Sequence, residues 1–343
     1  MNMIAFAKHF KKVLKRYMQQ AGISGNKKSY LRDKFDMLKY AAREWGVPFW
    51  WLLLDCFFTL VIHGETSEYY LASEMYKYNF MEKRRRLTVF RAFVLDYKYN
   101  IKATEEEKQR LFDKKLFNVC YKDYIGREWR YAPDETPESL RKFIEQHQNV
   151  FCKPYNLSWG AGIFVLNVND VTDEKIMELI DRQYLIEEIL DQHPAMKAIH
   201  PESVNTIRIF SIIDSLGVPH IALPYLRAGI GESVTDNICA GGIFYIVDPN
   251  TGIVNMTGRT LREQKRHIIH PNSDVIVPGF KVPYYEKICE MIKRAALVTP
   301  SLRYVGWDVA IAPNGPVLIE GNIEYAQTYQ GIDGLYREAK KYL

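Results

Sequence analysis

The sequence of 343 residues has few cysteines and no long apolar segment. Its five cysteines are odd in number and far apart, with no CxxC pair, which argues against a disulfide framework and against a cysteine-ligated metal. The longest apolar run, Val47 to Ile62, contains Asp55 and is shorter than the roughly 20 residues that a membrane-spanning helix needs. We therefore expect a buried or interfacial helix in this run.

The chain also shows no export signal, no internal repeat and no low-complexity segment. No N-terminal stretch combines a basic start, an apolar centre and a small-residue cleavage site, so we expect a cytoplasmic protein. The length exceeds the usual size of one hydrophobic core, which predicts two or three domains.

Positive charge is concentrated at one end of the chain. The net charge is +5, but the first 46 residues alone hold eleven Lys or Arg against three acids, a net charge of +8. The remainder is slightly acidic and contains no recognised RNA- or DNA-binding motif, so we expect no nucleic-acid partner.

The basic segment has the pattern of an amphipathic helix. Its apolar positions recur at helical spacing: Phe6, Phe10, Val13, Leu14, Tyr17 and Met18. Lysine and arginine side chains fill the opposite face. Such a helix could lie on the anionic inner face of a membrane, or its apolar stripe could pack on the next helix. Residues 29 to 125 continue helical and aromatic, and we assign residues 1–105 to a mainly helical N-terminal region.

After residue 148 the pattern changes to short β-branched runs that are broken by Gly, Pro and Asn. We predict strands at Val150–Lys153, Ile163–Val168, Gln183–Leu190, Asn205–Ile213, His220–Leu226, Ile243–Val247 and Ile253–Met256. Two helices interrupt them, at about Asp173–Asp181 and Pro283–Ala296. The fold class is therefore α+β.

The strongest local signal is a hairpin near the C-terminus. Strands at Arg303–Ile311 and Val317–Asn322 flank a predicted loop of five residues. If Ile311 faces Val317, then Asp308 lies opposite Glu320, with Cβ atoms about 4.5–5.5 Å apart. Strand alternation puts Asn322 on the same face, and it assigns the opposite, packed face to Val305, Trp307, Val309, Val317 and Ile319.

Two carboxylates that face each other across a ladder repel unless a cation lies between them. Oxygen ligands from Asp, Glu and Asn suit Mg²⁺, which usually shares its coordination shell with phosphates. The pattern predicts that Asp308, Glu320 and Asn322 form a magnesium site. A solvated hairpin is the alternative.

Weaker signals precede this hairpin. Lys153 is followed by a loop whose Gly160 and Gly162 allow backbone amides to approach an anion, although an ordinary turn would explain them equally well. Two acids, Glu187 and Glu188, end an apolar strand, where they could bind ribose or simply face solvent. The arginines Arg208 and Arg227 suit a phosphate or carboxylate, or a structural ion pair.

Taken in order, these elements resemble the ATP-grasp superfamily. The set begins with Lys114 after Asp113, and the doubled lysine leaves Lys115 as its competitor. The segments HPESVNTIRI, DNICAGG and GWDVAI with LIEGN look more specifically like the sugar-transfer-associated ATP-grasp family. The resemblance covers about residues 108 to 340. It implies an ATP-grasp fold, with two α+β lobes that clasp ATP, here at residues 106–190 and 191–343.

The resemblance also implies roles for individual residues. ATP would be held by Lys114, Lys153, Ser158, Gly160, Gly162, Glu187, Glu188 and Ile189. Magnesium, with two ions expected, would be bound by Asp308, Glu320 and Asn322. Arg208 and Lys153 would act in catalysis. The acceptor pocket is the least defined, and we assign to it Asn205, Arg227, Asn237, His270 and Tyr325.

The activity that the resemblance implies is ATP-dependent carboxylate–amine ligation through an acyl phosphate. The family suggests surface polysaccharide biosynthesis, with an amino acid or other amine joined to a sugar carboxylate. Two alternatives remain open: a kinase that uses the same fold, and a non-catalytic nucleotide-binding interaction protein.

Overall fold

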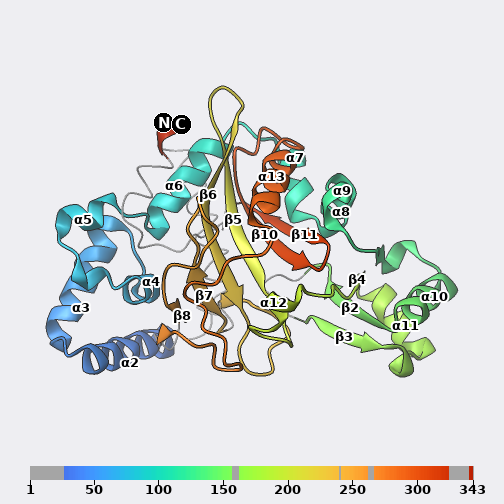
Figure 1. Ribbon diagram of the computed structural model, residues 1–343, viewed down its shortest axis with the longest axis horizontal. Coiled ribbons are helices and arrows are strands. Elements are labelled where there is room, and N and C mark those ends of the chain that lie inside the picture. The colour runs from blue at the N-terminus through green and yellow to red at the C-terminus, as the bar shows by residue number, and fades with distance from the viewer. Residues whose placement is uncertain (1–26, 157–161, 239–240, 262–265, 324–339, 343) are drawn as a thin grey trace.

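The computed structural model describes residues 27–156, 162–238, 241–261, 266–323 and 340–342. A helical region at one end, a seven-stranded sheet in the centre and a four-stranded sheet at the other end follow one another along the molecule (Figure 1). The mixture of helices and antiparallel sheets confirms the α+β class. The predicted basic helix at the N-terminus lies outside the described residues.

The helical region extends to residue 100. Its elements are α2 (Lys27–Trp45), α3 (Phe49–Phe58), a π-helical turn η1 (Thr59–His63), α4 (Ser67–Ala72), η2 (Met75–Lys77), α5 (Phe80–Arg85) and α6 (Val89–Asn100). Local signals set several boundaries: Gly64, in the left-handed conformation, ends η1, and Asn79 forms a capping box with Glu82 at the start of α5. No described helix combines the length and apolar character that crossing a bilayer requires.

Three short helices connect this region to the sheets: α7 (Glu105–Phe112), α8 (Lys114–Cys120) and α9 (Lys122–Ile125). Thr104 and Glu107 form the capping box that starts α7, and Asp113 ends it by capping α8 through its side chain. The three helices pack against the C-terminal strand of the large sheet. The first part of the expected lobe 106–190 thus belongs to the core of that sheet.

The small sheet has the order β1-β4-β2-β3 and is antiparallel throughout. Its strands are β1 (Trp129–Tyr131), β2 (Asn149–Pro154), β3 (Phe164–Asn167) and β4 (Tyr184–Glu188). Short 3-10 turns, η3 (Ala132–Asp134) and η4 (Val168–Asp170), and helices α10 (Pro137–His147) and α11 (Asp173–Asp181) complete the unit. Both helices contribute apolar side chains to one core with the sheet, and α11 has the predicted bounds.

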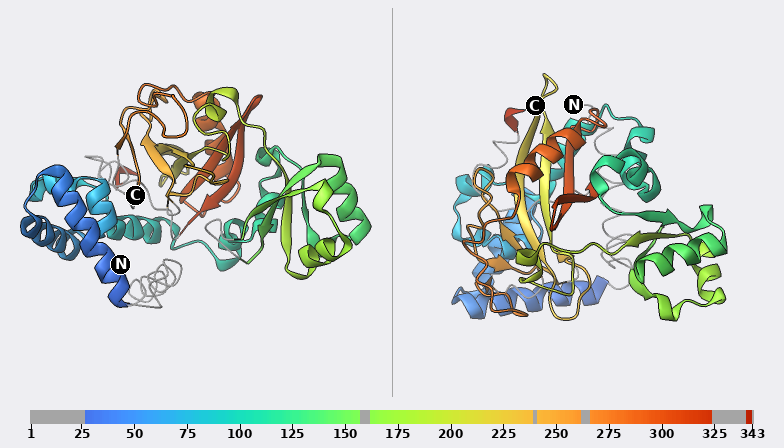
Figure 2. Two further views of the ribbon diagram at one scale, coloured as in Figure 1. Left: turned by 90° about the horizontal axis from the view of Figure 1, so that it is seen from below. Right: turned by 45° about the vertical axis from the view of Figure 1, so that its right-hand side comes forward.

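The large sheet is also antiparallel, with the order β11-β10-β5-β6-β7-β8-β9. It comprises β5 (Thr206–Ile213), β6 (Pro219–Ala228), β7 (Ile243–Ile246), β8 (Gly258–Arg259), β9 (Arg266–His267), β10 (Tyr304–Ala312) and β11 (Gly315–Asn322). The short helix α12 (Pro194–Lys197) precedes it. Helix α13 (Tyr285–Ala296) shares a core with one face of this sheet, and α6 covers part of the other face (Figure 2).

Two boundary predictions need correction. The segment predicted as a strand at Ile253–Met256 forms only isolated bridges, from Val254 to Val247 and from Ile253 to Lys281. Helix α13 begins at Tyr285 rather than at Pro283, because Tyr284 has a positive φ of 55° that interrupts the helical conformation.

The C-terminal hairpin combines a wrong prediction with a correct one. Ala312 pairs with Gly315 across a two-residue turn, so Ile311 faces Pro316 and not Val317. A β-bulge after Asp308 restores the register, and Asp308 lies opposite Glu320 as predicted. The bulge also changes the packed face, because Leu318, not Ile319, joins the core with Trp307 and Val309.

Candidate nucleotide and metal site

Asp308 lies at the centre of the large sheet and is 1 % exposed. Its strand neighbours are Arg208 on β5 and Glu320 on β11, because β10 lies between those strands. Arg208 donates through Nε and Nη2 to the two carboxylate oxygens, the second at 3.0 Å. Arg227 Nη2 lies 3.0 Å from the same Oδ2 atom. Burial opposes ionisation of Asp308, but the two guanidinium charges outweigh it and hold the pKa below its usual value.

Glu320 and Asn322 complete the acidic face of the hairpin. The Asn322 amide donates to Glu320 Oε1 at 3.3 Å. Although Glu320 is open to solvent on one side, desolvation by the surrounding protein and the nearby carboxylate of Asp308 raise its pKa. A cation placed between the two carboxylates would relieve this repulsion.

Arg227 belongs to a second network beside Asp308. Its guanidinium donates to the Thr206 hydroxyl at 3.0 and 2.7 Å, and its Nε atom lies 3.3 Å from Asp236. Thr206 in turn donates its backbone N–H to Asp236 at 2.9 Å. Both arginines therefore form ion pairs with buried acids, Arg208 with Asp308 and Arg227 with Asp236 and Asp308.

The small sheet contributes a buried ion cluster around Glu187. Arg127 Nη2 donates to Glu187 Oε1 at 2.9 Å, and Lys153 Nζ lies 2.5 Å from Oε2. The Asn118 amide adds a contact at 3.3 Å. Burial alone would raise the pKa of Glu187, but the charges of Arg127 and Lys153 outweigh burial and hold it well below its usual value. The carboxylate is thus directed at protein cations, which does not fit the predicted contact with ribose.

Lys114, at the start of α8, points to the end of β2. Its Nζ atom donates to the carbonyl oxygens of Pro154 and Tyr155 at 2.8 and 2.9 Å. Lys115 lies elsewhere: it forms an ion pair with Asp134 at 2.5 Å. Of the two lysines, the structure therefore brings Lys114 to the region of Lys153.

These groups from different parts of the chain lie within electrostatic reach of one another. Desolvation lowers the pKa of Lys114, and the neighbouring charge of Lys153 lowers it further, whereas the charges of Glu320 and Glu187 oppose this shift. Arg127 joins the two sheets, because it also donates to the carbonyl oxygen of Leu318 on β11 at 2.9 Å. Three cations, Lys114, Lys153 and Arg127, and two acids, Glu187 and Glu320, therefore converge where the small sheet meets the acidic hairpin.

The remaining nucleotide-binding candidates lie at the end of β4 and in the turn before β3. Glu188 is the last residue of β4, and its carboxylate accepts the backbone N–H of Glu128 at 3.1 Å. Ile189, directly after the strand, is 39 % exposed. Gly162 has a positive φ of 70° in the turn before β3, as a tight loop requires. Ser158 and Gly160 of the same loop lie outside the described residues, as does Tyr325.

Two of the acceptor-pocket candidates are structural residues. The Asn205 amide is fully buried and donates to the carbonyl oxygens of Met196 and His200 at 2.9 and 2.8 Å. His270 is also fully buried, and its Nε2 atom contacts the carbonyl oxygen of Gly229 at 2.9 Å. Because these partners satisfy both side chains away from solvent, we withdraw them from the acceptor pocket.

Asn237 is half-buried in the loop before β7, where its carbonyl oxygen accepts the N–H of Gly242 at 3.0 Å. A Cβ atom at Gly242 would lie 2.6 Å from the carbonyl oxygen of Asp236, so close packing explains this glycine. This loop places Asp236 against Arg227.

Two residues of the site escaped the sequence analysis. Arg127 follows a helix-ending glycine and Asp236 opens the segment DNICAGG, but neither position carries a spacing pattern that identifies its partner. Their partners lie 60 and 30 positions away in the chain. The one feature of the sequence that could have drawn attention to Arg127 and Asp236 is a charged residue near a glycine-containing turn.

The donor atoms of the hairpin suit a hard cation. Within the part of the chain that the structure describes, no cluster joins three or more His, Cys, Asp or Glu side chains, so the candidate ligands are two carboxylates and an amide. Each carboxylate oxygen has two lone pairs, which leaves Asp308 able to accept from its arginines and to bind a metal as well. This set of oxygen donors fits Mg²⁺.

Comparisons with known proteins give similar solved structures and one matching family model. Among solved structures, similar ones include the ATP-grasp ligase PsnB complexed with a phosphomimetic variant of its minimal precursor, Mg and ADP, at 14% identity and a TM-score of 0.43, covering 70% of this chain and 60% of PsnB. D-alanyl-alanine synthetase A from Vibrio cholerae has 14% identity and a TM-score of 0.40, with 69% and 61% of the two chains covered.

The chain thus spans about three fifths of the length of these two enzymes. The comparison with curated proteins gives no match. The family model described as sugar-transfer associated ATP-grasp matches residues 94–340, which is more than half of the sequence. The match begins within α6 and includes both sheets and the acidic hairpin. The chain belongs to the sugar-transfer associated ATP-grasp family.

Proposed function

We propose that this protein is an ATP-dependent carboxylate–amine ligase that joins an amine, such as an amino acid, to a carboxylate of a sugar during surface polysaccharide biosynthesis. One observation supports the proposal most: Lys114, Lys153 and Arg208 converge with Asp308 and Glu320 from separate elements of the fold. Cations beside an acidic pair are what a metal-bound triphosphate requires.

ATP would lie at the junction of the two sheets. Lys114 and Lys153 would bind its phosphates together with the loop that contains Ser158, Gly160 and Gly162. Adenosine would lie along the end of β4, against Glu188 and Ile189. Glu187 would hold Lys153 and Arg127 in place, since its carboxylate contacts both.

Asp308, Glu320 and Asn322 would hold magnesium, as one ion or two. The ion would offset negative charge on the phosphates. Arg208 and Arg227 keep Asp308 ionised, because their charges lower its pKa, and an ionised carboxylate is the form that binds a metal.

The proposed reaction has two steps. An oxygen of the substrate carboxylate attacks the γ-phosphorus, the bond from that phosphorus to the β,γ-bridging oxygen breaks, and ADP leaves. The amine then attacks the acyl carbon of the acyl phosphate, inorganic phosphate leaves with the bonding electrons, and the nitrogen loses a proton to solvent. Arg208 and Lys153 would stabilise the charge on the transferring phosphoryl group. Arg227, Asn237 and Tyr325 are the remaining candidates for the acceptor side.

The acceptor chemistry also suggests a location. Assembly of a surface glycan would place the protein in the cytoplasm, next to the inner face of the membrane. The basic segment within the first 46 residues, with a net charge of +8, would favour an anionic surface there.

An ADP-release screen tests the proposal directly. Amino acids would be combined with uronic-acid sugars, and mass spectrometry would identify the product. We expect ADP release that requires both substrates, formation of an amide, and loss of turnover in a folded Glu320→Gln variant. A stable phosphorylated sugar without amide would instead show a kinase. Tight ATP binding without ADP release in any combination would show a non-catalytic binding protein.

A further inference from the structure

The apolar run that the sequence predicted as one buried or interfacial helix forms α3 and η1. Its polar side chains point inward. Asp55 accepts a hydrogen bond from the Tyr70 hydroxyl at 2.7 Å and forms an ion pair with Lys83 at 2.5 Å. Thr59 and His63 are buried on the same side, 1 % and 5 % exposed. The side of this segment that faces the protein therefore carries all of its polar groups.

The outward side is entirely apolar. Its exposed residues recur at helical spacing and are Trp50, Trp51, Leu54, Phe57, Phe58, Leu60, Val61 and Ile62. Trp50 is 69 % exposed and Val61 is 65 % exposed. Surface helices of soluble proteins normally show the reverse pattern, with polar groups facing water. A continuous apolar face of this kind indicates a binding surface.

A neighbouring helix extends this surface. The Phe80 ring of α5 lies 5.1 Å from the His63 ring of η1, and both Phe80 and Met81 are more than half exposed. We name these ten exposed residues of α3, η1 and α5 the α3–α5 surface. Figure 1 shows α3 at the outer edge of the helical region, at the end of the molecule opposite the small sheet.

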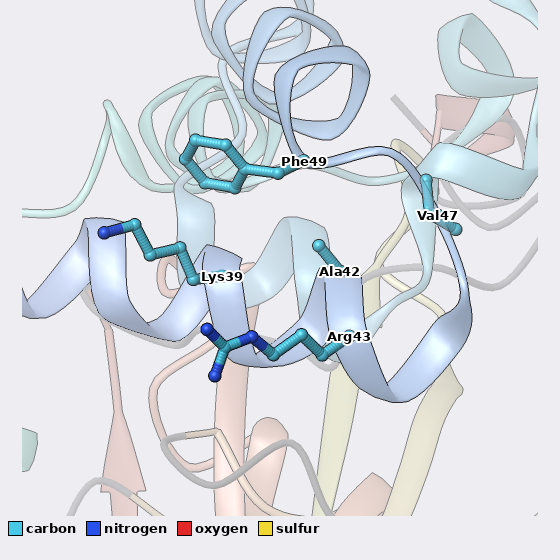
Figure 3. Close-up of a pocket in the computed structure, with 5 residues that line it drawn as sticks. All are labelled: Lys39, Ala42, Arg43, Val47 and Phe49. Carbon is cyan, nitrogen blue, oxygen red and sulfur yellow. The ribbon is translucent and has the colours of Figure 1, made fainter.

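Cations border the α3–α5 surface on two sides. Arg84 and Arg85 are exposed on α5. At the base of α3, Lys39 and Arg43 of α2 line an open pocket of about 330 Å³ together with Ala42, Val47 and Phe49 (Figure 3). Within the described residues, neither Lys39 nor Arg43 forms an ion pair with an acid. This combination of an apolar face with two tryptophans and a basic border suits the interface of an anionic lipid bilayer.

We propose that the α3–α5 surface inserts into one leaflet of an anionic membrane and holds the protein there as a monotopic membrane protein. The ten residues of α3 and five of η1 reach about 20 Å, less than the roughly 30 Å of a bilayer core, so the segment lies in the interface. A second copy of the chain would fit this surface less well, because two identical surfaces would bring their cationic borders together. The proposal does not depend on the catalytic function or on residues 1–26.

Vesicle flotation with the full-length protein tests the proposal. Vesicles would contain phosphatidylcholine alone or with phosphatidylglycerol. We expect the native protein to bind the anionic vesicles. The Phe57→Ser/Val61→Ser variant should bind them at least roughly tenfold more weakly, because each substitution removes apolar surface that would otherwise be buried in the lipid. Arg84→Gln/Arg85→Gln should weaken binding by roughly fivefold per charge. Leu216→Ser is the matched control. Leu216 is 87 % exposed on a loop of the large sheet, outside the α3–α5 surface, so its substitution should leave vesicle binding unchanged.

Quenching by brominated lipids identifies the contact itself. Trp50→Phe/Trp51→Phe should keep its vesicle binding but lose most of the tryptophan quenching, because the apolar side chains remain and the fluorophores do not. The proposal would be overturned if the Phe57→Ser/Val61→Ser variant, folded by circular dichroism, bound vesicles as well as the native protein does. That result would indicate that residues 1–26 bind the membrane instead. The proposal would also be overturned if the native protein did not bind vesicles and instead formed a dimer that the Phe57→Ser/Val61→Ser substitutions dissociate.

Discussion

At the residue scale, each buried charged side chain of the candidate site is stabilised by an oppositely charged neighbour. Glu187 is 3 % exposed and holds the cations Arg127 and Lys153. A buried cation that loses its counter-charge is costly, since neither water nor another carboxylate replaces the lost partner. The stability of the small sheet and its approach to β11 therefore depend on this one carboxylate.

The first prediction concerns Glu187→Ala. We expect the free energy of unfolding to fall by about 3–5 kcal/mol, because Arg127 and Lys153 both lose their buried partner. Urea denaturation would measure the change. Glu188→Ala, at the adjacent and more exposed position, is the control and should cost less than half as much. Equal losses for the two variants would contradict the account.

The second prediction concerns pH and His270. Burial lowers the pKa of His270 to about 4, so the folded protein keeps the ring neutral while the unfolded chain binds a proton below about pH 6.5. The unfolded state therefore gains stability as the pH falls through this window, and the folded protein should lose up to about 3 kcal/mol between pH 7 and pH 4.

Unfolding titrations of His270→Gln would check the sign of this effect. The glutamine amide can still donate to Gly229, but it does not titrate. The variant should lose less stability on acidification than the native protein does. Parallel pH profiles for the two proteins would show that His270 is not the group responsible.

Single residues also show what the sequence could predict. Asp308 and Glu320 were identifiable because they lie in one hairpin, where strand alternation and the turn relate them. The roles of Arg127 and Asp236 were not identifiable, because Glu187 and Thr206, which they contact, come from distant segments. Periodicity describes which face a residue occupies but not which remote residue meets it.

At the scale of elements, the C-terminal hairpin depends on close packing at Gly321. A Cβ atom there would lie 2.8 Å from Leu111 of α7 and 2.9 Å from the Trp307 ring on the neighbouring strand. A side chain at this position would press on Leu111 and Trp307 where β11 packs against β10 and α7. Because Gly321 lies between Glu320 and Asn322, its packing also positions both candidate metal ligands.

The third prediction is that Gly321→Ala destabilises the protein by about 1–3 kcal/mol, since the added methyl group overpacks the core. Trp307 fluorescence and thermal unfolding would follow the change. In a Trp307→Leu background the same substitution should cost less, because a smaller side chain leaves room. A cost that is the same in both backgrounds would exclude contact with Trp307 as the cause.

Elements with a strong pattern were predicted well, and short ones were not. The bounds of β5, β6 and α11 match the predictions within one or two residues, because their alternation or helical spacing is long enough to recognise. β1, β8 and β9 have only two or three residues and carry no usable pattern. The sequence also did not predict the bulge after Asp308. This bulge offsets the error in the predicted register at the turn, so that Asp308 still pairs with Glu320.

At the scale of the whole molecule, the helical region packs on the large sheet as part of one architecture. Helix α6 shares a core with the large sheet, and the Asn100 amide donates to the carbonyl oxygen of Tyr304 on β10 at 2.8 Å. The family match begins within this helix. The sequence predicted helices here but not how they dock, because an apolar run such as the one in α3 does not reveal which side faces the protein.

Residues between the two sheets also link them at the candidate site. Arg127 links Glu187 on the small sheet to Leu318 on the large one, and Lys114 approaches from the connecting helices. ATP with magnesium would add a further link, because its phosphates and metal would contact groups from both sides. The central claim is that the acidic hairpin binds the metal that accompanies ATP.

A crystal structure with Mn²⁺ and a non-hydrolysable ATP analogue tests this claim most directly, because manganese substitutes for magnesium and is visible by anomalous scattering. The account predicts an anomalous peak about 2.0–2.3 Å from carboxylate oxygens of Asp308 and Glu320, with the phosphates beside Lys114 and Lys153. A bound nucleotide whose metal lies away from both carboxylates would contradict it.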